Sequence, residues 1–157
     1  MNVTYRPATA ADTALVLCFI RDLAKYEQLS SECVATEEQI RGTLFSEKPV
    51  AECLLAFADG EPAGFAVFFT NFSTFLARPG LFLEDLFVKP TFRKRGIGRG
   101  LMERLARLAN ERGYGRMEWT VLDWNEPAIE FYRSLGGQPM EEWRIFRLSG
   151  PALARFA

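Results

Sequence analysis

The sequence predicts an α/β protein: a mixed β-sheet with helices packed on it, in a single domain spanning residues 1–157. Short runs rich in β-branched and aromatic residues alternate with segments of helical spacing. Hydrophobic residues make up 48% of the chain and charged residues 25%, as in ordinary globular proteins. A chain of 157 residues is long enough to bury one hydrophobic core. The predicted order is strand, two helices, three strands, helix, strand, helix and strand, with a short helix at the end.

The strands are predicted from alternation and from residues that favour strands. They are expected at residues 2–6, 52–58, 63–72, 81–88, 116–122 and 143–148. Asp59-Gly60 is a turn signal that joins the second and third strands as a hairpin. Residues 71–80, which contain Pro79-Gly80, are predicted to form a loop. Trp143 is expected to be a core residue of the last strand.

The helices are predicted from apolar residues at helical spacing and from residues that cap helix ends. They are expected to begin near Thr9, Thr36, Ile97 and Asn125. Thr36-Glu-Glu-Gln forms a capping box. Gly113 and Gly136 lie where the third and fourth helices should stop. A short helix is expected at residues 151–156.

Composition excludes several classes of function. Lys and Arg number 19 against 20 Asp and Glu, and this balance argues against a nucleic-acid-binding protein. No apolar run reaches the length of a membrane span, and the first residues lack a signal-peptide pattern, so we expect a cytoplasmic protein without a membrane partner. Three cysteines show neither a disulfide framework nor zinc spacing. Because the chain has no histidine, we expect no metal, and acid–base chemistry must use other side chains.

A basic, glycine-rich turn follows the strand expected at residues 81–88 and precedes a helix. Its four cations lie within seven residues, at Arg93, Lys94, Arg95 and Arg99. Its glycines allow close approach to the backbone, at Gly96, Gly98 and Gly100. The first N–H groups of the helix would add donors for an anion. This order predicts phosphate binding, and a solvated basic loop is the alternative; neither a P-loop nor a Rossmann pattern is present.

Two carboxylates interrupt the apolar strand before this turn. Strict alternation places Glu84 on one face with Phe82, Leu86 and Val88, and Asp85 on the other with Leu81, Leu83 and Phe87. A buried carboxylate is costly and its pKa rises, which suits a general base at neutral pH. The alternative is a pair of structural acids held by ion pairs or hydrogen bonds.

Other polar side chains have weaker signals of their own. Tyr132 lies on the helix that begins at Asn125, where a tyrosine is usually a core aromatic. Glu27 ends the first helix, and Glu142 precedes the last predicted strand. Taken alone, both glutamates are interpreted as solvated surface charges.

These motifs together resemble a known family. Arg93-x-x-Gly96-x-Gly98, after Glu84-Asp85-Leu86-Phe87-Val88, resembles the coenzyme A signature of the GCN5-related N-acetyltransferases, the GNAT superfamily. Further segments resemble its diamine acetyltransferase branch, which includes spermidine/spermine and thialysine acetyltransferases. These segments are residues 5–12, 23–27, 83–85, 124–127 and 131–132.

The resemblance implies the GNAT fold, with a mostly antiparallel central sheet of about six to seven strands that splays at the acetyl-CoA site. It implies that Tyr132 is a general acid and that Glu84 is a base acting through water. It implies that acetyl-CoA contacts Leu86, Phe87, Val88, Arg93, Lys94, Arg95, Gly96, Ile97, Gly98, Arg99, Gly100, Asn125, Pro127 and Ala128. It implies that the amine contacts Tyr26, Glu27, Glu84, Asp85 and Glu142.

The expected function is transfer of an acetyl group from acetyl-CoA to the primary amine of a small cationic molecule, by a homodimer. The alternatives are acetylation of a protein, a peptide or another small amine, and a module that binds acetyl-CoA without turnover. Residues 71–80 lack the acid and the tryptophan that the polyamine enzyme has there, and contribute Arg78 instead. Residues 121–125 are closer to the thialysine-type relative, so the identity of the amine stays open.

Overall fold

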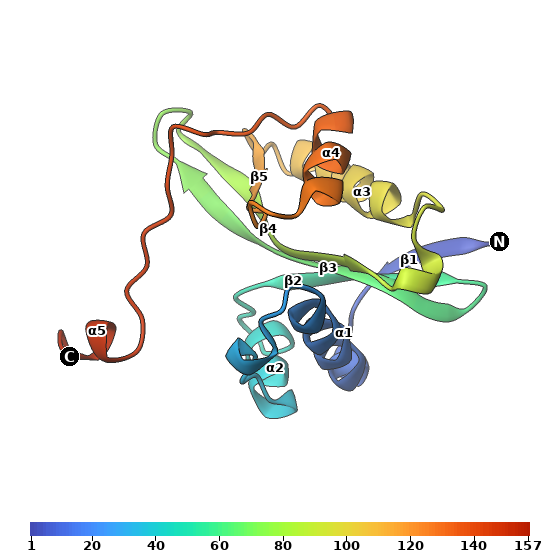
Figure 1. Ribbon diagram of the computed structural model, residues 1–157, viewed down its shortest axis with the longest axis horizontal. Helices are drawn as coiled ribbons and strands as arrows, with labels where there is room; N and C mark the ends of the chain where they lie inside the picture. Colours follow the sequence, from blue (N-terminus) through green and yellow to red (C-terminus); the bar gives the residue numbers. More distant parts are fainter. The chain divides into compact units, whose positions relative to one another are not determined.

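Five strands form a mixed sheet in the order β1-β2-β3-β4-β5 (Figure 1). Their bounds are β1 (Val3–Pro7), β2 (Glu52–Ala58), β3 (Glu61–Ser73), β4 (Arg78–Val88) and β5 (Met117–Trp119). The first four pair antiparallel in sequence order, and β5 runs parallel to β4. The predicted mixed, mostly antiparallel sheet is confirmed, with five strands instead of six to seven.

The computed structural model describes residues 1–157 and divides them into two compact units, Met1–Leu122 and Asp123–Ala157. The first unit contains the whole sheet and three helices, α1 (Thr13–Tyr26), α2 (Glu37–Leu44) and α3 (Ile97–Glu111). Helices α1 and α2 cover one face of the sheet, and α3 covers the other (Figure 1). None of the helices in the chain is both long enough and apolar enough to cross a membrane. That one domain spans the chain stays a prediction.

Local capping explains where the helices of the first unit begin. The Thr36 hydroxyl accepts a hydrogen bond from the Gln39 amide (3.3 Å), and the Gln39 side chain accepts one from the Thr36 amide (3.0 Å). This is the predicted capping box of α2. A similar box joins Thr9 and Asp12 ahead of α1. Asp12 also accepts two hydrogen bonds from Arg6 (2.8 and 2.9 Å), which ties β1 to the start of α1.

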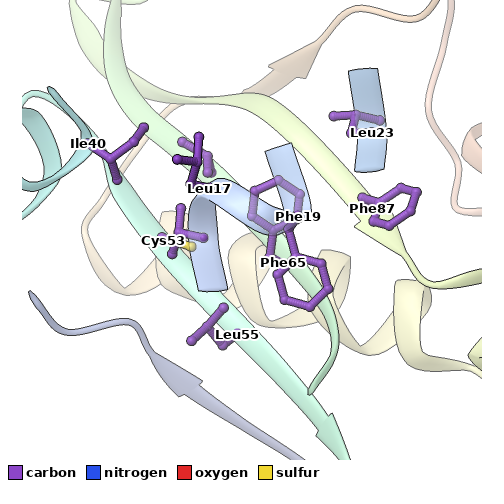
Figure 2. Close-up of a cluster of buried hydrophobic side chains, with 10 residues drawn as sticks. Leu17, Phe19, Leu23, Ile40, Cys53, Leu55, Phe65 and Phe87 are labelled. Carbon is purple, nitrogen blue, oxygen red and sulfur yellow. The ribbon is translucent and has the colours of Figure 1, made fainter. Parts of the chain in front are cut away.

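A cluster of aromatic and aliphatic side chains joins α1 to the sheet (Figure 2). The Phe19 and Phe65 rings stack with centroids 5.2 Å apart, and Phe87 meets Phe19 edge-on at 6.4 Å. Leu55 and Val16 are fully buried beside them. Burial of each large apolar side chain contributes about 1.5–3 kcal/mol, so this cluster holds α1 on β3 and β4.

The predicted loop at residues 71–80 is wrong, because most of it is a hairpin. β3 continues to Ser73 and β4 begins at Arg78, with Phe72 paired to Pro79. The turn is made by Ser73, whose hydroxyl accepts a hydrogen bond from the Leu76 amide (3.2 Å), and by Ala77 at a φ of 50°. Pro79 fits the strand because its missing N–H is not needed there, while its carbonyl accepts a bond from the Gly115 amide (2.9 Å).

The second unit contains α4 (Glu126–Ser134) and the short α5 (Pro151–Ala154), both close to prediction. The Asn125 side chain caps α4 by accepting a hydrogen bond from the Ala128 amide (3.4 Å). The strand predicted at residues 143–148 does not form, and the prediction of Trp143 as core is wrong, since its exposed fraction is 73%. A strand needs a neighbour for its backbone hydrogen bonds, and this unit contains no other strand.

Candidate active site

A β-bulge in β4 lies at the two predicted carboxylates. Val67 of β3 pairs with Asp85, but the next residue, Phe68, pairs with Leu83. Glu84 is therefore the extra residue of β4 at this point. The pairing of β4 with β5 covers only Leu81 to Leu83 and ends just before the bulge.

The bulge changes the face of the sheet on which Asp85 lies. Phe82 pairs with Phe69 before the bulge, while after it Asp85 pairs with Val67 and Phe87 with Phe65. Val67, Phe65 and Phe87 all belong to the core cluster under α1. Asp85 therefore lies on the α1 face, and the prediction that it shares a face with Leu81 and Leu83 is wrong. Alternation across β4 is broken because one residue has no partner on β3.

The two carboxylates have different environments. Asp85 is half-buried, and this burial, together with the charges of Glu84 and Glu27, raises its pKa to about 6. Burial also raises the pKa of Glu27, at the end of α1. Glu84 is exposed, so the expectation that both strand carboxylates are buried is met in part by Asp85 and is wrong for Glu84. The structure thus brings three acids, Glu27, Glu84 and Asp85, into one electrostatically coupled group.

Arg93 points away from the basic turn to which it belongs in the sequence. Its Nε–H donates a hydrogen bond to the Val88 carbonyl (2.8 Å) at the end of β4. Its guanidinium carbon lies 4.7 Å from the centroid of the Tyr26 ring and 5.4 Å from that of Phe87. Arg93 therefore contacts the end of α1, where two of the residues predicted to bind the amine lie.

The rest of the turn is open to solvent at the start of α3. Lys94, Arg95 and Arg99 are exposed around it. Lys94 and Gly96 both have positive φ, 61° and 80°, which bends the chain sharply into the helix. The Gly100 amide donates to the Gly96 carbonyl (2.9 Å), the first hydrogen bond of the helix. The amides at the start of an α-helix have no carbonyl partner within the helix, and here they lie beside three cations, an arrangement that suits an anion.

Gly100 has a packing role that the sequence did not indicate. A Cβ added at this position would overlap the Tyr5 hydroxyl and lie 2.6 Å from Tyr5 Cζ. The Tyr5 hydroxyl donates a hydrogen bond to the Ile97 carbonyl (3.4 Å), and the Arg104 guanidinium lies 3.8 Å from the ring centroid. Tyr5 of β1 thus supports the first turn of α3. Only the tertiary contact identifies it.

One edge of β4 is unpaired where contact with acetyl-CoA was predicted. Because β5 ends its pairing at Leu83, no strand of the sheet pairs with that edge from Glu84 to Val88. Extended backbone there can offer N–H and C=O groups to a ligand that lies alongside as a strand would. The residues predicted for this contact, Leu86, Phe87 and Val88, lie on this stretch. The same edge leads directly to the basic turn.

The remaining predicted site residues belong to the second unit. Asn125 is buried as the cap of α4, and Pro127 and Ala128 form its first turn. Tyr132 is half-buried on α4, with its ring 5.4 Å from the Phe131 ring. Glu142 is exposed in the segment after α4. The contributions of these residues to the site stay predictions.

A separate cavity of about 440 Å³ is lined by residues of β2, of α3 and of the end of α2. Its lining includes Leu54, Phe68 and Leu105, together with the Glu52–Arg112 ion pair. None of the predicted site residues lines it. This cavity is therefore distinct from the predicted site at the bulge and the turn.

Comparisons with known proteins identify the family of the chain. The sequence model of the acetyltransferase (GNAT) family matches residues 18–136. The chain is 36% identical to thialysine N-epsilon-acetyltransferase of Bos taurus, over 99% of this chain and 97% of that protein. It is 31% identical to L-ornithine N5-acetyltransferase of Arabidopsis thaliana, over 94% of this chain and 85% of that protein.

Solved structures show the same fold. An integron cassette protein from the mobile metagenome of V. cholerae superposes with a TM-score of 0.83 at 25% identity, over 99% of this chain and 98% of that one. A ribosomal-protein-alanine N-acetyltransferase from Brucella melitensis superposes with a TM-score of 0.73 at 19% identity, over 95% and 100% of the two chains. At 19% identity, the second similarity shows the fold alone.

Proposed function

The chain belongs to the acetyltransferase (GNAT) family and is an acetyl-CoA-dependent N-acetyltransferase, and we propose that it acetylates the primary amine of a small cationic molecule. The observation that supports this substrate class is the set of three coupled acids, Glu27, Glu84 and Asp85. Three acids close together create a negative field that attracts an ammonium group. The names of its relatives, thialysine and L-ornithine acetyltransferases, suggest a substrate with an amino-acid backbone and a side-chain amine.

The amine must lose a proton before it can react. A lysine-like ammonium has a pKa of about 10.4, so deprotonation at pH 7 costs about 4–5 kcal/mol. A carboxylate whose pKa is raised toward neutrality accepts such a proton more readily than an ordinary one. Asp85 has that property, and we propose that it shares this task with Glu84, which acts as a base through water. Tyr26, Glu27 and Glu142 complete the proposed amine pocket.

Transfer then joins the amine nitrogen to the acetyl carbon and breaks the carbon–sulfur bond of the thioester. We propose that Tyr132 protonates the departing thiolate, as a general acid. The β4 edge, the basic turn and the start of α4 are the proposed contacts of acetyl-CoA. They comprise Leu86, Phe87, Val88, Lys94, Arg95, Gly96, Ile97, Gly98, Arg99, Gly100, Asn125, Pro127 and Ala128, whereas the Arg93 guanidinium contacts Tyr26 and Phe87 instead. The proposal contains no metal.

The experiment that tests the substrate class is thiol release from acetyl-CoA with a panel of amines. We expect turnover with at least one of thialysine, L-ornithine, lysine, spermidine and putrescine, and slower turnover with an uncharged amine acceptor. Thiol release only with a peptide amine would contradict the proposal, and so would tight binding of acetyl-CoA without turnover of any amine.

Two substitutions test the catalytic roles. Glu84→Gln should lower turnover at neutral pH and lose less at high pH, where more of the amine is already neutral. Tyr132→Phe should lower turnover by about 10²- to 10⁴-fold with little change in acetyl-CoA affinity. Glu130→Gln, an exposed acid on the same helix as Tyr132, is the matched control. A pH-independent loss for Glu84→Gln, or full turnover for Tyr132→Phe, would remove the corresponding role.

We also propose that the protein is a homodimer that acts in the cytoplasm, without nucleic acid or membrane as a partner. Three apolar side chains are exposed at the β3–β4 hairpin: Phe72 (62%), Phe75 (99%) and Leu76 (48%). Apolar side chains grouped on a surface are typical of protein–protein contacts. Light scattering after gel filtration should give twice the chain mass, and Phe75→Ser should lower it; a monomeric wild-type protein would contradict the proposal.

A further inference from the structure

We propose that Arg93 is a positioning residue for the amine pocket. Its guanidinium holds Tyr26 and the end of α1 against the end of β4, and thereby sets the affinity for the amine. This inference rests on the proposed function, and it gives Arg93 a task different from that of the other cations of the turn. Those cations, Lys94, Arg95 and Arg99, remain the proposed partners of the pyrophosphate.

The contacts of Arg93 join three elements of the first unit. One hydrogen bond, from Nε to the Val88 carbonyl (2.8 Å), fixes the guanidinium at the end of β4. The ring of Tyr26 lies 4.7 Å from the guanidinium carbon, and the ring of Phe87 lies 5.4 Å from it. Both distances are within the range of cation–π contacts. Arg93 is half-buried, whereas its neighbours Lys94 and Arg95 are exposed.

The contact with Arg93 lies at the end of α1, where the chain changes direction and a helix needs tertiary contacts to stay ordered. After Tyr26 the helix ends, and Gln28 adopts a positive φ of 60°, so the chain turns sharply. Glu27 at this end is partly buried, and its charge reaches Asp85 on β4. Helix ends fray unless tertiary contacts hold them. A guanidinium on Tyr26 therefore fixes the neighbouring Glu27 relative to Asp85.

An arginine suits this position better than a lysine. The planar guanidinium can lie on an aromatic ring and donate to a carbonyl in the same arrangement, whereas an ammonium is a point charge. Both contacts also keep the positive charge directed at ring faces and a backbone carbonyl. A freely moving cation at the same place would compete with the amine for the carboxylates.

The first test separates the affinities for the two substrates. With thialysine as the amine, Arg93→Ala should raise KM for thialysine about 3- to 30-fold, as expected for loss of a cation–π contact, and change KM for acetyl-CoA less. Arg95→Ala, in the same turn, should do the reverse. Arg93→Lys should give an intermediate KM for thialysine. A rise confined to the KM for acetyl-CoA in Arg93→Ala would overturn the proposal.

A double-mutant cycle tests whether the effect passes through the tyrosine ring. Tyr26→Ala and Arg93→Ala should each raise KM for thialysine, and the double variant should be no worse than the more affected single variant. Additive effects would show that Arg93 acts independently of Tyr26 and would overturn the proposal. Arg95→Ala combined with Tyr26→Ala is the matched control, for which additivity is expected.

Hydrogen exchange supplies a measurement that needs no turnover. The amides of Glu27, Gln28 and Leu29 donate to carbonyls in the last turns of α1. Their exchange should quicken in Arg93→Ala and, to a smaller degree, in Arg93→Lys, but not in Arg95→Ala. Unchanged exchange in both Arg93 variants would overturn the proposal. Because exchange is read on the protein alone, an inactive wild-type protein would refute the proposed function and leave this test intact; if Arg93→Ala does not fold, Arg93→Lys decides.

Discussion

Asp85→Asn should make the protein more stable at neutral pH while lowering its activity. The folded protein raises the pKa of Asp85 from 3.8 to about 6, because the carboxyl is buried beside the charges of Glu84 and Glu27. Between these two pH values the folded state still holds a proton that the unfolded state has released. Wild-type stability therefore falls as the pH rises through this window.

The size of the stability difference follows from the pKa shift of Asp85. One pKa unit corresponds to about 1.4 kcal/mol, so a rise of about two units means that ionised Asp85 lowers the free energy of unfolding by up to about 3 kcal/mol above pH 6. Asparagine has nearly the same shape and no charge. Asp85→Asn should thus exceed wild-type stability by up to about 3 kcal/mol near pH 8, and the difference should vanish near pH 4.

Urea unfolding of both proteins at several pH values between about 4 and 8 measures this difference. Glu47→Gln, which removes an exposed carboxylate from the same unit, is the matched control and should show little pH-dependent change. Thiol release should meanwhile fall in Asp85→Asn, since the amine pocket loses a charge. A stability difference that stays constant across the pH range, or one that favours the wild type above pH 6, would refute the reasoning.

Two further predictions concern the scaffold. Gly100→Ala should lower the free energy of unfolding by about 1–3 kcal/mol, because its methyl group would overlap the Tyr5 ring; thermal melting measures the loss, and adding Tyr5→Ala should cancel the clash. Asp12→Asn should cost about 1–2 kcal/mol near pH 7, because it weakens the capping of Thr9 and the bond from Arg6. These contacts hold the pKa of Asp12 well below its usual range, so the cost should start to shrink as the pH falls below about 4 and continue to shrink toward the lower pKa of the folded state; an equal cost throughout the acidic range would contradict this explanation.

The helices and their ends were predictable because the signals that specify them are local. The capping box at Thr36, the cap at Asn125 and the stop at Gly113 each involve residues a few positions apart. The basic turn at the start of α3 was predictable for the same reason. Its glycines, cations and helix start all lie within one short segment.

The strands were predicted less well than the helices. Pairing with a neighbouring strand decides whether a segment forms a strand and on which face of the sheet each side chain lies. Alternation placed Asp85 with Leu83, and the bulge at Glu84 moved it to the opposite face. The segment 143–148 has strand-forming residues but pairs with no strand of its own unit. Neither outcome depends on local preference, since a strand is stabilised by hydrogen bonds to a neighbour that can be distant in sequence.

Residue order alone was sufficient for the helices, the basic turn before α3 and the family to which the chain belongs, since these depend on short-range spacing. The three-dimensional arrangement alone decided which carboxylate is buried, and it turned Arg93 toward Tyr26 instead of the turn. Burial and charge coupling arise between residues far apart along the chain, such as Glu27 and Asp85. Their energies depend on distance in space, which no spacing in the sequence encodes.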